Sequence, residues 1–239
     1  MKQLLSKFRK AVIDFDLIED GDNIAIGLSG GKDSLTLLNL LSKYRTFSPE
    51  KFNIIAITID PGTDMNFSPL KKLCKELDVE LHIIDSNIKE IVFNIRKEKN
   101  PCSLCANLRR GILNDNAKKF GCNKVALGHH KNDAIETLLL SMFYEGRISC
   151  FLPKTYLDRK DITIIRPMVY IDESSIKKAS VKYDFPIIQN PCPANGLTKR
   201  ESIKNLIESL KKDFPDLDNR LLGALTNTDQ LCIWYKKNK

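Results

Sequence analysis

The sequence predicts a doubly wound α/β fold, in which helices cover both faces of a mainly parallel, five-stranded sheet. Short apolar runs rich in β-branched residues alternate along the chain with longer segments whose apolar residues recur at helical spacing. The strand-like runs are almost continuously apolar, as strands buried on both faces are. Parallel neighbours need crossover connections, which the intervening helices would supply.

The expected strands end at turn residues such as Pro61-Gly62 and Pro167. They cover residues 24–28, 52–60, 81–85, 124–128 and 162–167. An amphipathic helix is expected over residues 2–18, stopped by Glu19-Asp20-Gly21. Further helices are expected over residues 35–41, 69–77, 88–95, 106–120, 134–143, 172–183 and 197–212, with a small lid or tail near 221–234.

This order suggests an N-terminal helix (1–20), a main α/β domain (21–190) and a helical C-terminal region (191–239) that is part of the same unit. The 239 residues are 42% hydrophobic, as in an ordinary packed core. No stretch approaches the ~18 apolar residues of a membrane helix, and no signal peptide is recognisable, so a cytoplasmic protein is expected. The net charge of +8 suits a polyanionic partner or simply a basic surface.

A glycine-rich junction between the first strand and the next helix has the properties of a phosphate-binding loop. Its residues are Ser29, Gly30, Gly31, Lys32, Asp33 and Ser34, directly after Leu28. Glycines let the backbone approach a ligand, and the helix N-terminus presents N–H groups and partial positive charge to it. The spacing excludes the Walker pattern G-x-x-x-x-G-K-[ST], and G-x-G-x-x-G is absent.

Other polar residues follow further strands of the predicted sheet. Ile59 and Asp60 end the second strand, and Gly128, His129, His130, Asn132 and Asp133 follow the fourth. In open α/β sheets, ligands bind beyond the carboxyl ends of the strands. These segments should therefore converge with the glycine-rich loop on one edge.

Seven cysteines in a reducing compartment indicate metal, cluster or catalytic use more than disulfides. Cys102 and Cys105 form a C-x-x-C pair, and Cys192 lies between Pro191 and Pro193. Structural zinc usually has four ligands, whereas three cysteines fit a [4Fe–4S] cluster with one open iron. A redox-active dithiol is the alternative. The other cysteines are assigned to packing: Cys74, Cys122, Cys150 and Cys232.

Several short motifs, in this order, resemble the PP-loop ATP pyrophosphatase superfamily, and most closely the tRNA cytidine-32 2-sulfurtransferases among the tRNA 2-thiolation enzymes. The likeness spans about residues 24–207. It rests on the loop Leu28 to Ser34 and on the segments 101–106, 108–111, 128–130, 136–138, 142–144 and 165–167.

The resemblance implies a cytoplasmic enzyme that uses ATP, Mg²⁺ and a [4Fe–4S] cluster held by Cys102, Cys105 and Cys192. ATP would adenylylate the C2 oxygen of a tRNA pyrimidine, and sulfide held at the open iron would then replace it. The implied partners are tRNA and a sulfur donor, either a cysteine desulfurase or sulfide. A homodimer is one option for its assembly.

The residue types suggest individual roles around ATP. Lys32, the two loop serines and the loop amides would bind phosphates, Lys32 as a catalytic residue. Asp33 and Asp133 could hold Mg²⁺ or polarise the reacting centre, and Asp133 is the carboxylate favoured as catalytic. The resemblance places Ile59, Asp60 and Gly128 near the nucleotide. It also points to Arg109 as a catalytic position, where a permanently charged guanidinium could stabilise an oxyanion but not act as a base.

The sequence departs from its relatives at two places. Asn132 replaces the first carboxylate of the Gly-His-His-x-Asp-Asp pattern, which leaves Asp133, and the turn at Cys192 has a single cysteine where relatives often have C-x-x-C. The zinc-binding cysteine clusters of the 2-thiouridine branch are not recognisable, which favours the cytidine branch. Two alternatives stay open: a PP-loop sulfurtransferase for a small molecule, and a non-catalytic iron–sulfur or zinc RNA-binding protein.

Overall fold

The computed structural model describes residues 1–62, 65–96, 101–188, 199–230 and 232. The chain forms two compact units, Met1–His130 with Leu152–Gly196, and Lys131–Phe151 with Leu197–Lys239. Residues 131–151 are thus grouped with the C-terminal helices, which the sequence pattern had not suggested.

The first unit contains a six-stranded sheet with the order β3-β2-β1-β4-β6-β5. Its strands are β1 (Asn23–Gly27), β2 (Asn53–Asp60), β3 (Glu80–Asp85), β4 (Lys124–Ala126), β5 (Lys154–Leu157) and β6 (Ile162–Ile165). All neighbours are parallel except β5 and β6. The predicted fold class is confirmed, but the prediction of five strands missed β5, a half-exposed edge strand without a strong apolar pattern.

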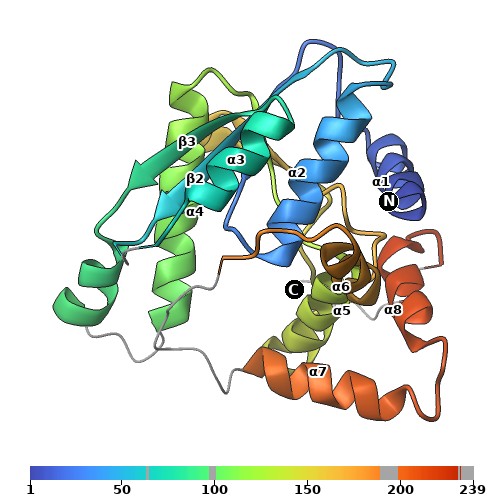
Figure 1. Ribbon diagram of the computed structural model, residues 1–239. Coiled ribbons are helices and arrows are strands. Elements are labelled where there is room, and N and C mark those ends of the chain that lie inside the picture. Colours follow the sequence, from blue (N-terminus) through green and yellow to red (C-terminus); the bar gives the residue numbers. More distant parts are fainter. Residues whose placement is uncertain (63–64, 97–100, 189–198, 231, 233–239) are drawn as a thin grey trace. The chain divides into compact units, whose positions relative to one another are not determined.

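Helices cover both faces of this sheet (Figure 1). They are α1 (Lys2–Asp14), α2 (Lys32–Arg45), α3 (Ser68–Glu76), α4 (Pro101–Lys119) and α6 (Glu173–Lys182). Ile24 and Ile26 of β1 lie in the core that α1, α2, α3 and α6 share, whereas Ala25 points to the opposite core, beneath α4. This alternation follows the two-residue period of a strand and explains the continuous apolar runs.

Two shorter segments of the first unit differ from ordinary helix. Residues expected to form a helix over 88–95 form the π-helix η1 (Glu90–Ile95), and a 3₁₀ turn, η3 (Asp158–Lys160), connects β5 to β6.

The second unit consists of α5 (Lys131–Leu140), the π-helical η2 (Ser141–Glu145), α7 (Lys199–Leu210) and α8 (Leu217–Thr226). Its buried core is small: Ile135 and Leu139 of α5 pack with Ile203 and Ile207 of α7. The last helix begins and ends earlier than the segment expected near 221–234, and Trp234 lies outside the described residues. No helix in the described ranges is both long and apolar enough to cross a bilayer.

Candidate nucleotide and sulfur-transfer site

The glycine-rich loop connects β1 to α2 at the carboxyl edge of the sheet. Its entry is fixed by two bonds to β2: the Leu28 N–H donates to the Ile57 carbonyl at 2.9 Å, and the Thr58 hydroxyl donates to the Leu28 carbonyl at 2.8 Å. Gly30 has φ +80°, a left-handed conformation that favours glycine. The Gly30 carbonyl accepts from Ile188 N–H at 3.0 Å, which ties the loop to the chain after α6.

Gly31 precedes α2 in an extended conformation, and among the described residues no side chain caps this helix. The N–H groups of its first turn therefore keep the capacity to bind an anion. Ser34 is buried and donates to the Gly31 carbonyl at 3.0 Å, while its Oγ lies 3.2 Å from Ser29 Oγ. The loop is thus pre-formed, with backbone donors at its open end.

Lys32 lies between two carboxylates. Its Nζ is 3.0 Å from Asp33 Oδ2 and 3.2 Å from Oε1 of Glu173, which opens α6. Burial favours the neutral amine, but attraction to Asp33 and Glu173 outweighs burial and raises the pKa of Lys32. The lysine is therefore a fixed positive charge at the phosphate-binding loop.

The segment after β4 packs directly against this loop. A Cβ on Gly128 would come within 3.1 Å of the Asp33 carbonyl and 3.2 Å of Ser34 N, so the close approach favours glycine. His130 Nε2 lies 3.7 Å from Asp33 Oδ1, and Arg166 Nε donates to His129 Nδ1 at 3.3 Å. The structure therefore brings the predicted Gly128 segment to the loop and gives His129 an orienting contact.

Ile59 and Asp60 end β2 at the same edge of the sheet, next to β1. Asp60 Oδ1 accepts from Gly62 N–H at 2.8 Å, and the Asp60 carbonyl accepts from the Ser86 hydroxyl at 2.7 Å. These bonds fix the turn beside the loop, where the sequence predicted the adenosine to bind.

Cys102 and Cys105 lie at the start of α4. They are three residues apart and so share one face of the helix; Cys102 is exposed and Cys105 half-buried. Cys192 lies outside the described residues, so the predicted triad is not tested. Within the described ranges no three His, Cys, Asp or Glu side chains form a metal-binding group.

The packing role predicted for the other four cysteines holds for two of them. Cys74 and Cys122 are buried, and burial raises the pKa of each thiol to about 11, which disfavours the thiolate needed for metal binding. Cys150 is half-buried, with its Sγ 3.4 Å from the Ala134 carbonyl. The packing assignment was wrong for Cys232, which is exposed.

Arg109 follows Cys105 by four residues on α4, so the two side chains share a helix face. Its Nε is buried and has no hydrogen-bond partner among the described residues. A buried guanidinium nitrogen without an acceptor is costly and fits a position awaiting an anionic group.

Asp133 lies in the first turn of α5, in the second unit, where Arg200 of α7 approaches it at 3.4 Å. The same guanidinium binds Glu136 at 2.9 Å and Thr137 Oγ1 at 3.2 Å. Burial raises the pKa of Glu136, although the hydrogen bond and charge of Arg200 act in the opposite direction. The relation of Asp133 to the loop of the first unit stays a prediction.

Glu173 and Arg200 had not been predicted as site residues. For Glu173 the sequence held a signal: an acidic residue opens the helix that follows β6, on the edge where the other candidates converge. Arg200 had no comparable signal, because only the packing of α7 on α5 brings it to Asp133 and Glu136.

Comparison with known proteins agrees with this geometry. The PP-loop domain family model matches residues 2–210. The tRNA-cytidine(32) 2-sulfurtransferase of Syntrophotalea carbinolica is 40% identical over 91% of this chain and 86% of its own length. The protein of the same name from Geobacter sulfurreducens is 38% identical over 95% of this chain and 90% of its own length.

A solved structure shares the fold along the whole chain. The U34-tRNA thiolase NcsA from Methanococcus maripaludis, with its [4Fe-4S] cluster, has a TM-score of 0.77 and 25% identity, covering 99% of this chain and 80% of its own. These relatives confirm the resemblance that the motifs indicated. The chain therefore belongs to the PP-loop domain family, in the group of enzymes whose members are named tRNA-cytidine(32) 2-sulfurtransferase.

Proposed function

We propose that this protein is an ATP-dependent tRNA sulfurtransferase that replaces the C2 oxygen of a pyrimidine, cytidine in the first instance, with sulfur. The observation that carries the proposal is the pre-formed loop in which Lys32 and the uncapped start of α2 meet at the carboxyl edge of the sheet. The names of the relatives supply the substrate class.

In the first step, the C2 oxygen of the base attacks the α-phosphorus of ATP. An oxygen–phosphorus bond forms, the bond to the bridging oxygen of the β-phosphate breaks, and pyrophosphate leaves. Negative charge grows on the departing phosphates, which Lys32, the Ser34 hydroxyl and the N–H groups of α2 would stabilise. The Ile59-Asp60 turn and Gly128 would face the nucleoside.

Asp33 and Asp133 would hold Mg²⁺, since carboxylate oxygens are the ligands this cation prefers. Asp33 fits because its carboxylate belongs to the loop and lies next to Lys32. Asn132, in place of a carboxylate, keeps only a carbonyl oxygen as a ligand, so Asp133 would supply the negative charge.

Cys102, Cys105 and Cys192 would hold the [4Fe–4S] cluster. The first two fit, because they present thiols from one face of α4, where Cys102 is exposed and Cys105 is half-buried. When bound, the cluster supplies an open iron position for a sulfur ligand. Arg109, on the same face of α4, would stabilise negative charge on the adenylylated base.

In the second step, sulfide forms a bond to C2 and loses its proton; persulfide sulfur from a cysteine desulfurase would first be reduced to sulfide by two electrons from a thiol reductant. The bond between C2 and oxygen breaks, and AMP leaves with that oxygen. Neither carbon nor sulfur changes oxidation state in this substitution. Arg109 would act by charge alone, because it cannot accept the proton. The cytoplasm remains the expected location of this reaction.

Mass spectrometry of tRNA nucleosides from a strain lacking this protein tests the proposal. A missing 2-thiopyrimidine, restored by the purified, iron–sulfur-reconstituted protein with ATP and sulfide, is the expected result. ATP cleavage that needs no tRNA would favour a small-molecule substrate. Tight tRNA binding without any pyrophosphate release would favour a non-catalytic RNA-binding protein.

A further inference from the structure

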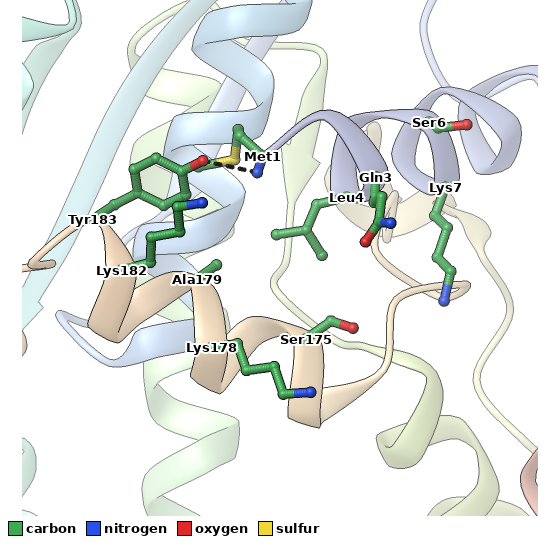
Figure 2. Close-up of a pocket in the computed structure, with 10 residues that line it drawn as sticks. All are labelled: Met1, Gln3, Leu4, Ser6, Lys7, Ser175, Lys178, Ala179, Lys182 and Tyr183. Atoms are coloured by element: carbon green, nitrogen blue, oxygen red, sulfur yellow. Dashed lines mark hydrogen bonds between the residues drawn. The ribbon is translucent and has the colours of Figure 1, made fainter.

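A groove with a volume of about 640 Å³ lies between α1 and α6 in the first unit (Figure 2). Leu4 of α1 and Ala179 of α6 are buried at its base. Polar and basic side chains line the rest: Gln3, Ser6, Lys7, Ser175, Lys178, Lys182 and Tyr183.

The sequence period of α6 creates this lining. Ser175, Lys178 and Lys182 are three and four residues apart, so they point from one face of the helix, as Figure 2 shows. The Tyr183 hydroxyl accepts from the Met1 nitrogen at 2.9 Å, which ties the start of α1 to the end of α6. The groove is therefore bounded by two helices that this hydrogen bond connects.

The charge of the lining has one sign. It contains three lysines and no acidic residue. Asp172 neutralises Lys7 at 2.5 Å, but in the described part of the chain Lys178 and Lys182 are in no salt bridge. Hydroxyls of Ser6, Ser175 and Tyr183 add hydrogen-bond donors. Lysines and hydroxyls together are the groups that proteins use to contact phosphate oxygens.

The same helix connects the groove to the phosphate-binding loop. Glu173, the first residue of α6, pairs with Lys32 and also with Lys177 at 3.2 Å. Lys177, Lys178 and Lys182 then follow along the exposed side of α6. From Glu173 to Lys182 the helix rises ~14 Å, a distance that a few nucleotides of backbone can bridge.

We propose that the groove between α1 and α6 binds the phosphodiester backbone of the RNA substrate while the target base is at the loop. This inference rests on the proposed function. Charge complementarity selects the occupant, because an apolar peptide would leave Lys178 and Lys182 without a counter-charge, whereas on RNA each lysine replaces a cation condensed on a phosphate, and that cation is released. Recognition there is by backbone charge, so the groove supplies affinity and register but no base specificity.

Charge reversal at Lys178→Glu with Lys182→Glu tests the proposal. Both side chains are exposed, so the helix should stay folded. The matched control is Lys43→Glu with Lys51→Glu, which changes the net charge equally at two exposed positions, at the end of α2 and before β2, that do not line the groove. Binding of unmodified tRNA is measured by fluorescence anisotropy over a salt series, and ATP binding by calorimetry.

The groove variant should bind tRNA roughly tenfold more weakly, with a salt slope smaller by about 2, one for each lysine. The control should lose less than about threefold, and both variants should bind ATP as the parent does. The milder Lys178→Gln with Lys182→Gln should give an intermediate loss. Equal losses of tRNA affinity in the groove and control variants, or no loss in either, would overturn the proposal that the groove binds RNA. Absence of tRNA binding in the parent would instead overturn the proposed function.

Discussion

Lys32 of the glycine-rich loop and Glu173 of α6 form an ion pair of 3.2 Å, across 141 residues of sequence. The Glu173 side chain is only 13% exposed, so solvent screens this pair less than a surface pair. The contact connects the phosphate-binding loop to the helix that also lines the basic groove. It makes Glu173 a positioning residue for Lys32.

Glu173→Gln should weaken the ATP site. Removing this carboxylate lowers the pKa of Lys32 and leaves Asp33 as its remaining acidic partner, so the ammonium is held less firmly. We expect the KM for ATP to rise roughly three- to tenfold in a pyrophosphate-release assay. Lys177→Gln is the control, because it removes another ion-pair partner of Glu173 and keeps the pair with Lys32. Tighter ATP binding by Glu173→Gln would mean that the carboxylate competes with phosphate.

Lys32→Ala should slow pyrophosphate release by about a hundredfold or more, since it removes the charge that stabilises the leaving phosphates. The visible spectrum of the reconstituted cluster should stay unchanged, because Cys102 and Cys105 are on α4. Loss of both the spectrum and the activity would show that the fold, and not the loop, had failed.

Cys102→Ala, Cys105→Ala and Cys192→Ala should each bleach the cluster absorbance after anaerobic reconstitution with iron and sulfide, and each should leave ATP binding intact. Cys232→Ala is the control, because this thiol is exposed and outside the predicted triad. An unchanged spectrum in any of the three variants removes that cysteine from the ligand set.

Gly128→Ala should distort the loop. Its methyl group would meet backbone atoms of Asp33 and Ser34 at 3.1–3.2 Å, which cannot turn away as a side chain does. We expect a loss of about 1–3 kcal/mol in the free energy of unfolding, together with weaker ATP binding. Gly223→Ala in α8 meets nothing within 4 Å and should be neutral or slightly stabilising. Equal behaviour of the two variants in urea denaturation and ATP binding would contradict the close approach.

Glu19→Gln should change how the free energy of unfolding depends on pH in the acidic range. Hydrogen bonds from Lys124 and Lys154 lower the pKa of Glu19 to about 2 from 4.5, so its contribution is complete above about pH 4.5 and is lost as the pH falls to about 2. The variant should be less stable at pH 7 by about 1 kcal/mol or less, because Glu19 is half-exposed. This difference should vanish near pH 2. Urea denaturation between pH 7 and pH 2 measures this difference in the free energy of unfolding, and Glu76→Gln, at an exposed position, is the control. A difference that does not change with pH would exclude the ion pairs of Glu19 as its cause.

Local patterns along the chain were enough to predict the fold class, the loop and most helices. The β-branched runs of β1 and β2 and the Ser29 to Ser34 loop are encoded by neighbouring residues, so periodicity and glycine spacing reveal them. The edge strand β5 was not predicted, because a half-exposed strand has no continuous apolar run and is defined by its pairing with β6.

The residue types available at the site can be read along the chain: the loop, Lys32, the C-x-x-C pair and Arg109. Which of their charges meet depends on how the chain folds. Lys32 pairs with Glu173, and Asp133 pairs with Arg200, because helices that are far apart in the chain pack together. Hydrophobic burial brings such helices together without regard to the polar residues they present. The partner of a charge is therefore a property of the packed fold, which no local pattern contains.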